Sequence, residues 1–166
     1  MTARVQWTDY DSATCSIART LELVGDRWSL LLLRDLFNGV HRFDDLRGHV
    51  GVSRDVLTKR LAGLVDAGLV ERRAYRVEGE RGRASYHLTG AGKDLQPVLV
   101  ALMAWGDRHL TGDEAPPARL EHVGCGGAVT VALACEEDHP VARRDVRLLP
   151  TESARRRTSR VSAASG

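Results

Sequence analysis

The sequence predicts a mainly α-helical protein with a small β wing, arranged as a winged helix-turn-helix and followed by a small C-terminal β-rich unit. In residues 52–70, Ser53 is a favourable helix N-cap, and leucines recur at helical spacing until Gly68, a residue type that commonly ends helices. Residues 69–89 then have the pattern of a strand, a basic glycine-containing turn and a second strand. A short amphipathic helix followed at once by such a hairpin is the order of elements in a winged helix-turn-helix.

The exposed front of this helix and the turn of the hairpin carry the residues expected to contact double-stranded DNA. A helix with an apolar back and a basic N-terminal front fits a major groove, and arginines at a hairpin tip reach the phosphate backbone or the minor groove. The candidate DNA-binding residues are Ser53, Arg54, Thr58, Lys59, Arg60, Arg81 and Arg83. Two alternatives stay open: the helix is an ordinary amphipathic surface helix, or Arg60 pairs with a carboxylate within the fold.

Three helices are expected ahead of this one. After an arm at residues 1–14, the expected helices cover residues 15–25, 28–37 and 43–49, the second with a stop at Asn38–Gly39. In the first, Ile17, Leu21 and Val24 are spaced as one buried face. The second is apolar nearly all round, which predicts the central helix of the core. In the third, Phe43 and Leu46 are expected to point inward.

A further helix is expected at residues 89–110, with a start or a kink near Pro97, because proline cannot donate to the helical hydrogen-bond ladder. Its apolar face consists of Leu95, Val98, Leu99, Leu102 and Trp105. This face is broader than one small domain buries, so we expect a helix of a second subunit to cover it. The alternative is that the helix packs only on its own core.

The expected organisation is therefore a winged-helix domain with flanking dimerisation helices (1–110), a linker (111–118), a small β unit (119–150) and a disordered basic tail (151–166). The β unit contains the strand-like segments VTVALA and VRLL, whereas the tail has four arginines and no apolar period.

In the β unit, His122, Cys125, Cys135 and His139 form H-x2-C-x9-C-x3-H. Imidazole and thiolate are preferred zinc ligands, so this spacing predicts a degenerate zinc-ribbon-like unit with a structural zinc. The alternative is a unit that packs without metal.

Composition and charge indicate an ordinary globular protein that is neither strongly basic nor membrane-spanning. The chain of 166 residues has 43% hydrophobic and 28% charged residues and a net charge of only +2, so any affinity for nucleic acid must come from local clustering of basic residues. No apolar run is long enough to cross a bilayer and no secretory signal is evident, which predicts a cytoplasmic protein without a membrane partner. No catalytic constellation stands out, and we expect no enzyme activity.

Three segments of the chain resemble a known family. They are CSIARTLELVGDRWSLLLLRDL, RFDDLRGHVGVSRDVLTKRLAGLVDAGLVERR and YHLTGAGKDLQPVLVALMAW. Together they are similar to the HxlR family of bacterial winged-helix transcription regulators, over roughly residues 15–110. The resemblance implies a homodimer on a roughly two-fold operator, and regulation by a small molecule or a reactive electrophile in some members.

The resemblance also bears on two of the sites. A cysteine at the position of Cys15 serves as a redox or electrophile sensor in some members, and Cys15 precedes an expected helix, whose N-terminus stabilises a thiolate. The alternative for Cys15 is a small buried hydrophobic side chain. Some members with the C-terminal extension have a second thiol where this chain has Asp138, which leaves Asp138 or His139 as the substitute ligand, or no site at all.

The function expected from the sequence is a sequence-specific DNA-binding transcription regulator, a repressor acting as a homodimer with an unknown effector. The alternative is a winged-helix protein-interaction module, in which the zinc-ribbon-like unit binds a protein partner.

Overall fold

The computed structural model describes residues 5–75 and 83–157. Within them the helices are α1 (Ser16–Val24), α2 (Arg27–Phe37), α3 (Phe43–Val50), α4 (Arg54–Asp66), α5 (Gly90–Lys93) and α6 (Gln96–His109), and the strands are β1 (Val70–Tyr75) and β2 (Arg83–Leu88). Short 3-10 helices lie at Trp7–Asp9, Ser12–Thr14 and Arg143–Asp145. This order confirms the expected winged helix-turn-helix.

Local signals fix the ends of the two helices of the helix-turn-helix. The helix α3 ends at Gly51, whose φ of +73° is a left-handed conformation that glycine adopts without a steric cost. Two residues later Ser53 caps α4, and its hydroxyl oxygen accepts a hydrogen bond from the backbone N–H of Val56 at 3.3 Å. The turn between α3 and α4 therefore spans residues 51–53.

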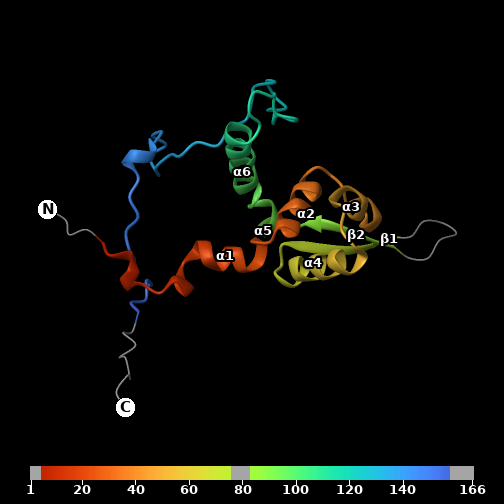
Figure 1. Ribbon diagram of the computed structural model, residues 1–166, viewed down its shortest axis with the longest axis horizontal. Helices are drawn as coiled ribbons and strands as arrows, with labels where there is room; N and C mark the ends of the chain where they lie inside the picture. The colour runs from red at the N-terminus through yellow and green to blue at the C-terminus, as the bar shows by residue number, and fades with distance from the viewer. Residues whose placement is uncertain (1–4, 76–82, 158–166) are drawn as a thin grey trace, which may run out of the picture.

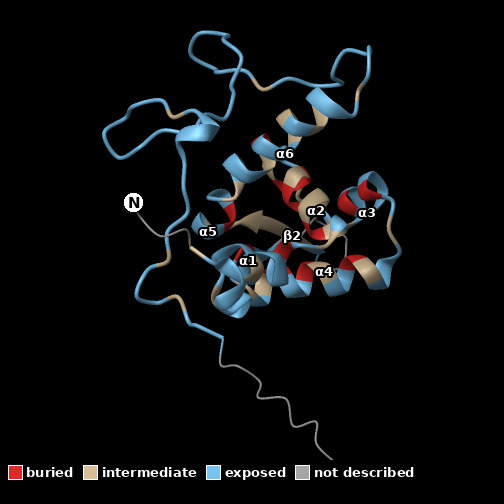
Figure 2. Ribbon diagram, turned by 60° about the vertical axis from the view of Figure 1, so that its left-hand side comes forward, coloured by how far each residue is buried: buried red, intermediate tan, exposed pale blue. Residues whose placement is uncertain are grey.

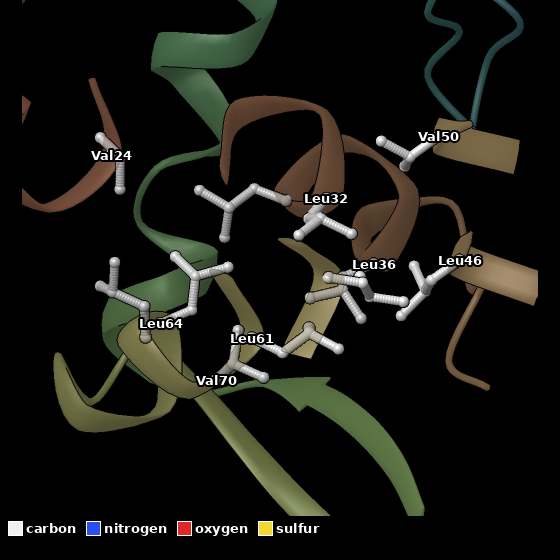
Figure 3. Packing of buried hydrophobic residues seen from close by; sticks show 11 residues of the cluster. Val24, Leu32, Leu36, Leu46, Val50, Leu61, Leu64 and Val70 are labelled. Atoms are coloured by element: carbon white, nitrogen blue, oxygen red, sulfur yellow. The ribbon is translucent and has the colours of Figure 1, made fainter. Parts of the chain in front are cut away.

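The core lies where α2, α3, α4 and β1 meet. Its fully buried side chains come mostly from leucines of these helices, as Figure 3 shows for the packing around Leu32, Leu46, Leu61 and Val70. The helix α2 contacts α1, α3, α4, α6 and β2, which confirms the expected central position. Phe43 and Leu46 both pack on this core, as expected.

The wing is an antiparallel pair in which Val70 faces Leu88 and Tyr75 faces Arg83. Residues just before α3 pair with the other side of β2. Arg42 forms a bridge with Ser85, and the backbone N–H of Tyr86 donates to the carbonyl oxygen of His41 at 2.9 Å. Three chain segments thus lie side by side at the base of the wing, and successive residues along each point to opposite faces.

The expected helix at 89–110 is interrupted, and α6 starts at Gln96 with Pro97 in its first turn. One part of its apolar face packs on the core, and the other part is exposed to solvent. Leu95 and Leu99 pack against the core, whereas Val98, Leu102 and Trp105 remain exposed. The partner helix expected to cover the exposed part is not supplied by the described residues of this chain.

The helix α1 differs from its expectation. Val24 is buried, but the Ile17 side chain is 71% exposed and Leu21 is 56% exposed. The reason is geometric, because α1 extends away from the body and only its last turn reaches the core (Figure 1).

A close approach at the base of the wing requires glycine at position 92, and we predict a loss of stability for Gly92→Ala. An added Cβ would lie 2.1 Å from the backbone carbonyl oxygen of Leu69, which cannot rotate away. We expect the free energy of unfolding to fall by about 1–3 kcal/mol or more. Gly90→Ala is the matched control, because nothing lies within 4 Å of the Cβ it adds. Urea unfolding measures both variants, and equal midpoints would contradict the prediction.

The C-terminal region does not form the expected β unit. Residues 119–150 contain two isolated bridges, Glu121 with Ala128 and Ala134 with Pro140, but no strand. Nearly all of these residues are exposed (Figure 2), and a strand needs a paired partner and a buried face to be stable. The segments VTVALA and VRLL have neither and form no strand, so the structure does not show the expected zinc-ribbon-like unit.

The first part of the expected disordered tail pairs with the N-terminal arm. Tyr10 forms an antiparallel bridge with Arg156, and the Arg156 guanidinium lies 5.7 Å from the centre of the Tyr10 ring. Two backbone hydrogen bonds flank this bridge, from Asp11 N–H to Arg155 oxygen at 2.9 Å and from Arg157 N–H to Asp9 oxygen at 2.7 Å. Residues 158–166 lie outside the described part of the chain. No helix among the described residues is long and apolar enough to span a membrane.

Candidate DNA-binding surface

Four arginines from four segments line one shallow cavity of about 350 Å³. They are Arg42, immediately before α3, Arg54, the first residue of α4, Arg72 in β1 and Arg83 in β2. These segments are brought together at the end of the molecule opposite α1 (Figure 1). We call these four residues the arginine cluster. Asp44 and Asp45 line the same cavity, so the four guanidinium groups leave a local surplus of two positive charges, four minus two.

The side chain of Arg54 is held at the start of α4 by two neighbours. Its Nη2 lies 3.7 Å from Oδ1 of Asp44, and its guanidinium carbon lies 5.1 Å from the centre of the Phe43 ring. The Arg54 side chain is nevertheless 65% exposed, so the guanidinium stays accessible to a ligand. Asp44 thus orients Arg54 and also competes with any phosphate for it.

The remaining front of α4 is polar and solvent-accessible. Thr58 and Lys59 are exposed on the turn that follows Arg54, whereas Leu57 and Leu61 on the back are buried. Ser53 is exposed as well and caps the helix. The expected division of α4 into a buried back and an accessible front is therefore present.

Arg60 does not belong to this front. Its Nε lies 3.2 Å from Oδ1 of Asp26, the N-cap residue of α2. This is the alternative that the sequence left open, in which Arg60 pairs with a carboxylate within the fold. Placing Arg60 among the candidate DNA contacts is therefore wrong, because its side chain forms an ion pair that links α4 to α2.

Asp26 is the centre of this internal contact. Its Oδ1 accepts hydrogen bonds from the backbone N–H groups of Trp28 and Ser29, and its Oδ2 accepts one from the Ser29 hydroxyl at 2.5 Å. Burial alone would raise the pKa of Asp26, but the Ser29 hydrogen bonds and the positive charge of Arg60 outweigh it, so the pKa lies below the ordinary 3.8.

We predict that this interaction makes stability depend on pH. A lowered pKa in the folded state means that the Asp26 carboxylate contributes stability above its ordinary pKa, and that this contribution is lost as the pH falls through the folded pKa. Asp26→Asn should lower the free energy of unfolding near neutral pH by about 1 kcal/mol, and by less at about pH 3. Thermal unfolding of both proteins at the two pH values measures this. An equal difference in stability between wild type and Asp26→Asn at the two pH values would contradict the lowered pKa of Asp26.

The other sequence candidates are placed as follows. Arg83 lies in the arginine cluster, whereas Arg81 falls outside the described residues. Sequence reasoning missed Arg42 and Arg72 as site residues. Both become visible only when the pairing of residues 40–43 and β1 with β2 is known, and no local signal distinguishes them from other surface arginines.

Cys15 is exposed and is the N-cap residue of α1, with no hydrogen bond from its side chain to the helix. Within this chain, Cys15 therefore does not occupy the buried position that the sequence left open as an alternative.

The four candidate zinc ligands form two separate pairs. His122 Nδ1 lies 3.1 Å from the Cys125 sulfur, and His139 Nδ1 lies 3.6 Å from the Cys135 sulfur. Among the described residues no group of three His, Cys, Asp or Glu side chains is placed to hold a metal ion. A tetrahedral zinc site needs four ligands around one point, so zinc binding here requires the two pairs to come together and stays a prediction.

Comparison with known proteins agrees with this geometry. The family model for HxlR-like helix-turn-helix proteins matches residues 23–114. An uncharacterized HTH-type transcriptional regulator of Mycobacterium tuberculosis is 46% identical over 120 residues, which cover 72% of this chain and 75% of the relative. A second such regulator, from Synechocystis, is 37% identical over 93 residues, covering 55% of this chain and 67% of the relative.

Solved structures add the fold. The crystal structure of PA1607, described as a transcription factor, superposes with a TM-score of 0.72 at 31% identity and covers 84% of this chain and 96% of its own. The redox regulator HypR in its oxidized form superposes with a TM-score of 0.51 at 26% identity, covering 57% of this chain and 96% of its own. The chain therefore belongs to the HxlR-like helix-turn-helix family, and it is a transcriptional regulator of the helix-turn-helix type.

Proposed function

We propose that this protein is a sequence-specific repressor that binds a two-fold DNA operator as a homodimer. The observation that carries the proposal is the arginine cluster beside the accessible front of α4. In the proposed complex, the start of α4 enters the major groove and the base of the wing contacts the flanking backbone. Repression follows if the operator overlaps a promoter.

The chemistry of the cluster suits DNA. An arginine can donate two parallel hydrogen bonds to O6 and N7 of guanine, and each such contact discriminates by about 1–3 kcal/mol. Guanidinium groups on phosphates release counterions, which makes binding fall steeply with salt. In our proposal Arg54, Thr58 and Lys59 face the groove, and Arg42, Arg72 and Arg83 face the phosphates.

The homodimer is supported by uncovered apolar surface on two helices. Ile17, Leu21 and Leu23 of α1 are more than half exposed, as is Trp105 of α6, next to Leu102 at 50%. Several large apolar side chains left exposed on one helix commonly mark an interface between proteins. In the proposed dimer, α1 and α6 of two copies cover one another and place the two α4 helices about 34 Å apart, one turn of the duplex.

The proposal is tested by titrating the protein with the DNA upstream of its own gene and with a shuffled duplex of equal length and composition. We expect tighter binding to the upstream DNA, with a steep dependence on salt for both duplexes. Equal affinity for both duplexes would contradict the regulator. That result would favour the alternative, a winged-helix module that binds a protein.

Cys15 supplies a candidate input for regulation, and we propose that its oxidation releases the DNA. The support is its exposed position at the N-terminus of α1, a helix of the proposed dimer interface, since a helix N-terminus favours the reactive thiolate. HypR, a similar structure, is a redox regulator. The proposal extends only to oxidants and electrophiles that a thiolate attacks.

We predict that Cys15→Ser binds DNA as the wild type does but no longer releases it after mild oxidant. Cys125→Ser is the matched control, because it removes another exposed thiol far from α1 in the sequence. The measurement is DNA-binding affinity before and after peroxide treatment. Equal release by wild type and Cys15→Ser would end the sensor role.

A further inference from the structure

A second cavity, of about 420 Å³, lies behind the wing. Its apolar wall is formed by Leu36 and Phe37 at the end of α2 and by Leu88 of β2. Its polar wall is formed by His41, Arg73, His87 and Lys93, with Gln96 at the start of α6. This volume lies in the range of small-molecule sites, which combine an apolar lining with a few polar groups.

The two histidines of the polar wall are fixed. Their rings stack with centres 4.2 Å apart and an angle of 30° between planes. The Nδ1 of His41 lies 2.9 Å from the carbonyl oxygen of Tyr86. Because a carbonyl oxygen only accepts, the His41 Nδ1 must carry its proton. His87 is oriented by its Nε2, which lies 3.0 Å from the Ser85 hydroxyl.

The charges around the cavity favour an anion. Arg73 pairs through its Nε with Glu71 at 3.0 Å, while Lys93 on α5 is exposed and makes no ion pair with a described carboxylate. Burial lowers the pKa of His87, and the positive charges of His41 and Arg73 lower it further against the opposing effect of Glu71. An anion placed beside His87 would relieve that repulsion.

The cavity is distinct from the arginine cluster. His41 and Arg42, Arg72 and Arg73, and Tyr86 and His87 are neighbouring pairs on the three segments that lie side by side at the base of the wing. Successive residues of an extended strand point to opposite faces. The two linings do not overlap in these pairs: His41, Arg73 and His87 line this cavity, and Arg42, Arg72 and Tyr86 line the DNA-facing one.

We propose that this cavity binds a small organic carboxylate. The carboxylate lies between Lys93 and the histidine pair, and its hydrocarbon body packs on Leu36, Phe37 and Leu88. The role of such a ligand as an effector rests on the proposed function, because the same strands carry the DNA-facing arginines.

Benzoate is the probe, and benzamide is its neutral counterpart of nearly the same shape. The chain contains six histidines, whose ring signals can be followed by NMR during a titration of the full chain. We expect benzoate to shift the signals of His41 and His87 saturably while leaving those of His49, His109, His122 and His139 in place. Benzamide should shift none of them. Absence of a saturable shift, or equal shifts with benzamide, would overturn the proposal.

A pair of variants tests the polar wall. Lys93→Gln should weaken benzoate binding about tenfold or more, because it removes one charge-assisted contact. Lys59→Gln makes the same change of charge on α4 and should leave benzoate binding unchanged. Both lysines are exposed, so neither substitution disturbs the core. Equal affinity of the two variants would also overturn the proposal.

The effector role is tested separately, by measuring DNA affinity with and without benzoate. A change in DNA affinity on adding benzoate supports the effector role, and saturable benzoate binding without such a change overturns that role but leaves the anion site. If the protein binds benzoate but shows no preference for its upstream DNA, the proposed repressor fails and the anion site stands.

Discussion

Replacing Arg54 and Arg72 together by alanine is expected to abolish operator binding at physiological salt. Both belong to the arginine cluster, and both side chains are exposed, so the fold should persist. If Arg54 contacts a guanine, its loss costs about 1–3 kcal/mol. Loss of one phosphate contact at Arg72 lowers the slope of log affinity against log salt by about one. In the proposed complex of a homodimer on a two-fold operator, each loss occurs twice.

Fluorescence anisotropy across a range of salt concentrations measures the affinity and its slope, and circular dichroism checks the fold. Arg119→Ala is the matched control, since Arg119 is an exposed arginine whose Nη2 pairs with Glu121 outside the cluster. Asp44→Asn should act in the opposite direction and tighten binding, because it removes the carboxylate that competes for Arg54. If the double variant binds like the Arg119 control, the arginine cluster is not the DNA-binding surface.

Replacing Leu102 by glutamate is expected to convert the dimer into a monomer and to cost much of the operator affinity. Leu102 is half exposed in the single chain, on the face of α6 that our proposal places against a second copy. An unpaired carboxylate in an apolar interface costs several kcal/mol. Two linked half-sites gain about a hundredfold to ten-thousandfold over one, and the monomer loses that gain.

Sedimentation equilibrium measures the oligomeric state of this variant, and anisotropy measures its DNA affinity. Val123→Glu is the control, because Val123 is fully exposed in the C-terminal region and the substitution changes charge in the same way. A Leu102→Glu protein that remains dimeric would place the dimer interface elsewhere. A wild-type protein that is monomeric would reject the homodimer itself.

The helix α4 and the wing were predictable from the sequence because the patterns that indicate them are local. Ser53 supplies the cap, the leucines of α4 repeat at helical spacing, and Pro97 marks the start of α6. Each of these depends only on residues within a turn or two of the chain. The order of elements followed from them.

Features that depend on distant contacts were not predictable. The apolar pattern of α1 predicted burial of Ile17, but a periodic pattern does not say whether the covering surface belongs to the same chain. The strand-like segments 129–134 and 146–149 have β propensity but no partner strand, and propensity alone does not make a sheet. Arg42 and Arg72 join Arg54 only through the pairing at the base of the wing.

The central claim is that the arginine cluster and the front of α4 form the DNA-binding surface. Amide hydrogen exchange of the full chain, free and bound to its upstream duplex, tests it most directly. The account predicts slower exchange on binding at residues 42–45, 53–60, 72–74 and 83–86. Slower exchange confined to residues 119–157, with no change at the start of α4 or in the strands of the wing, would contradict it.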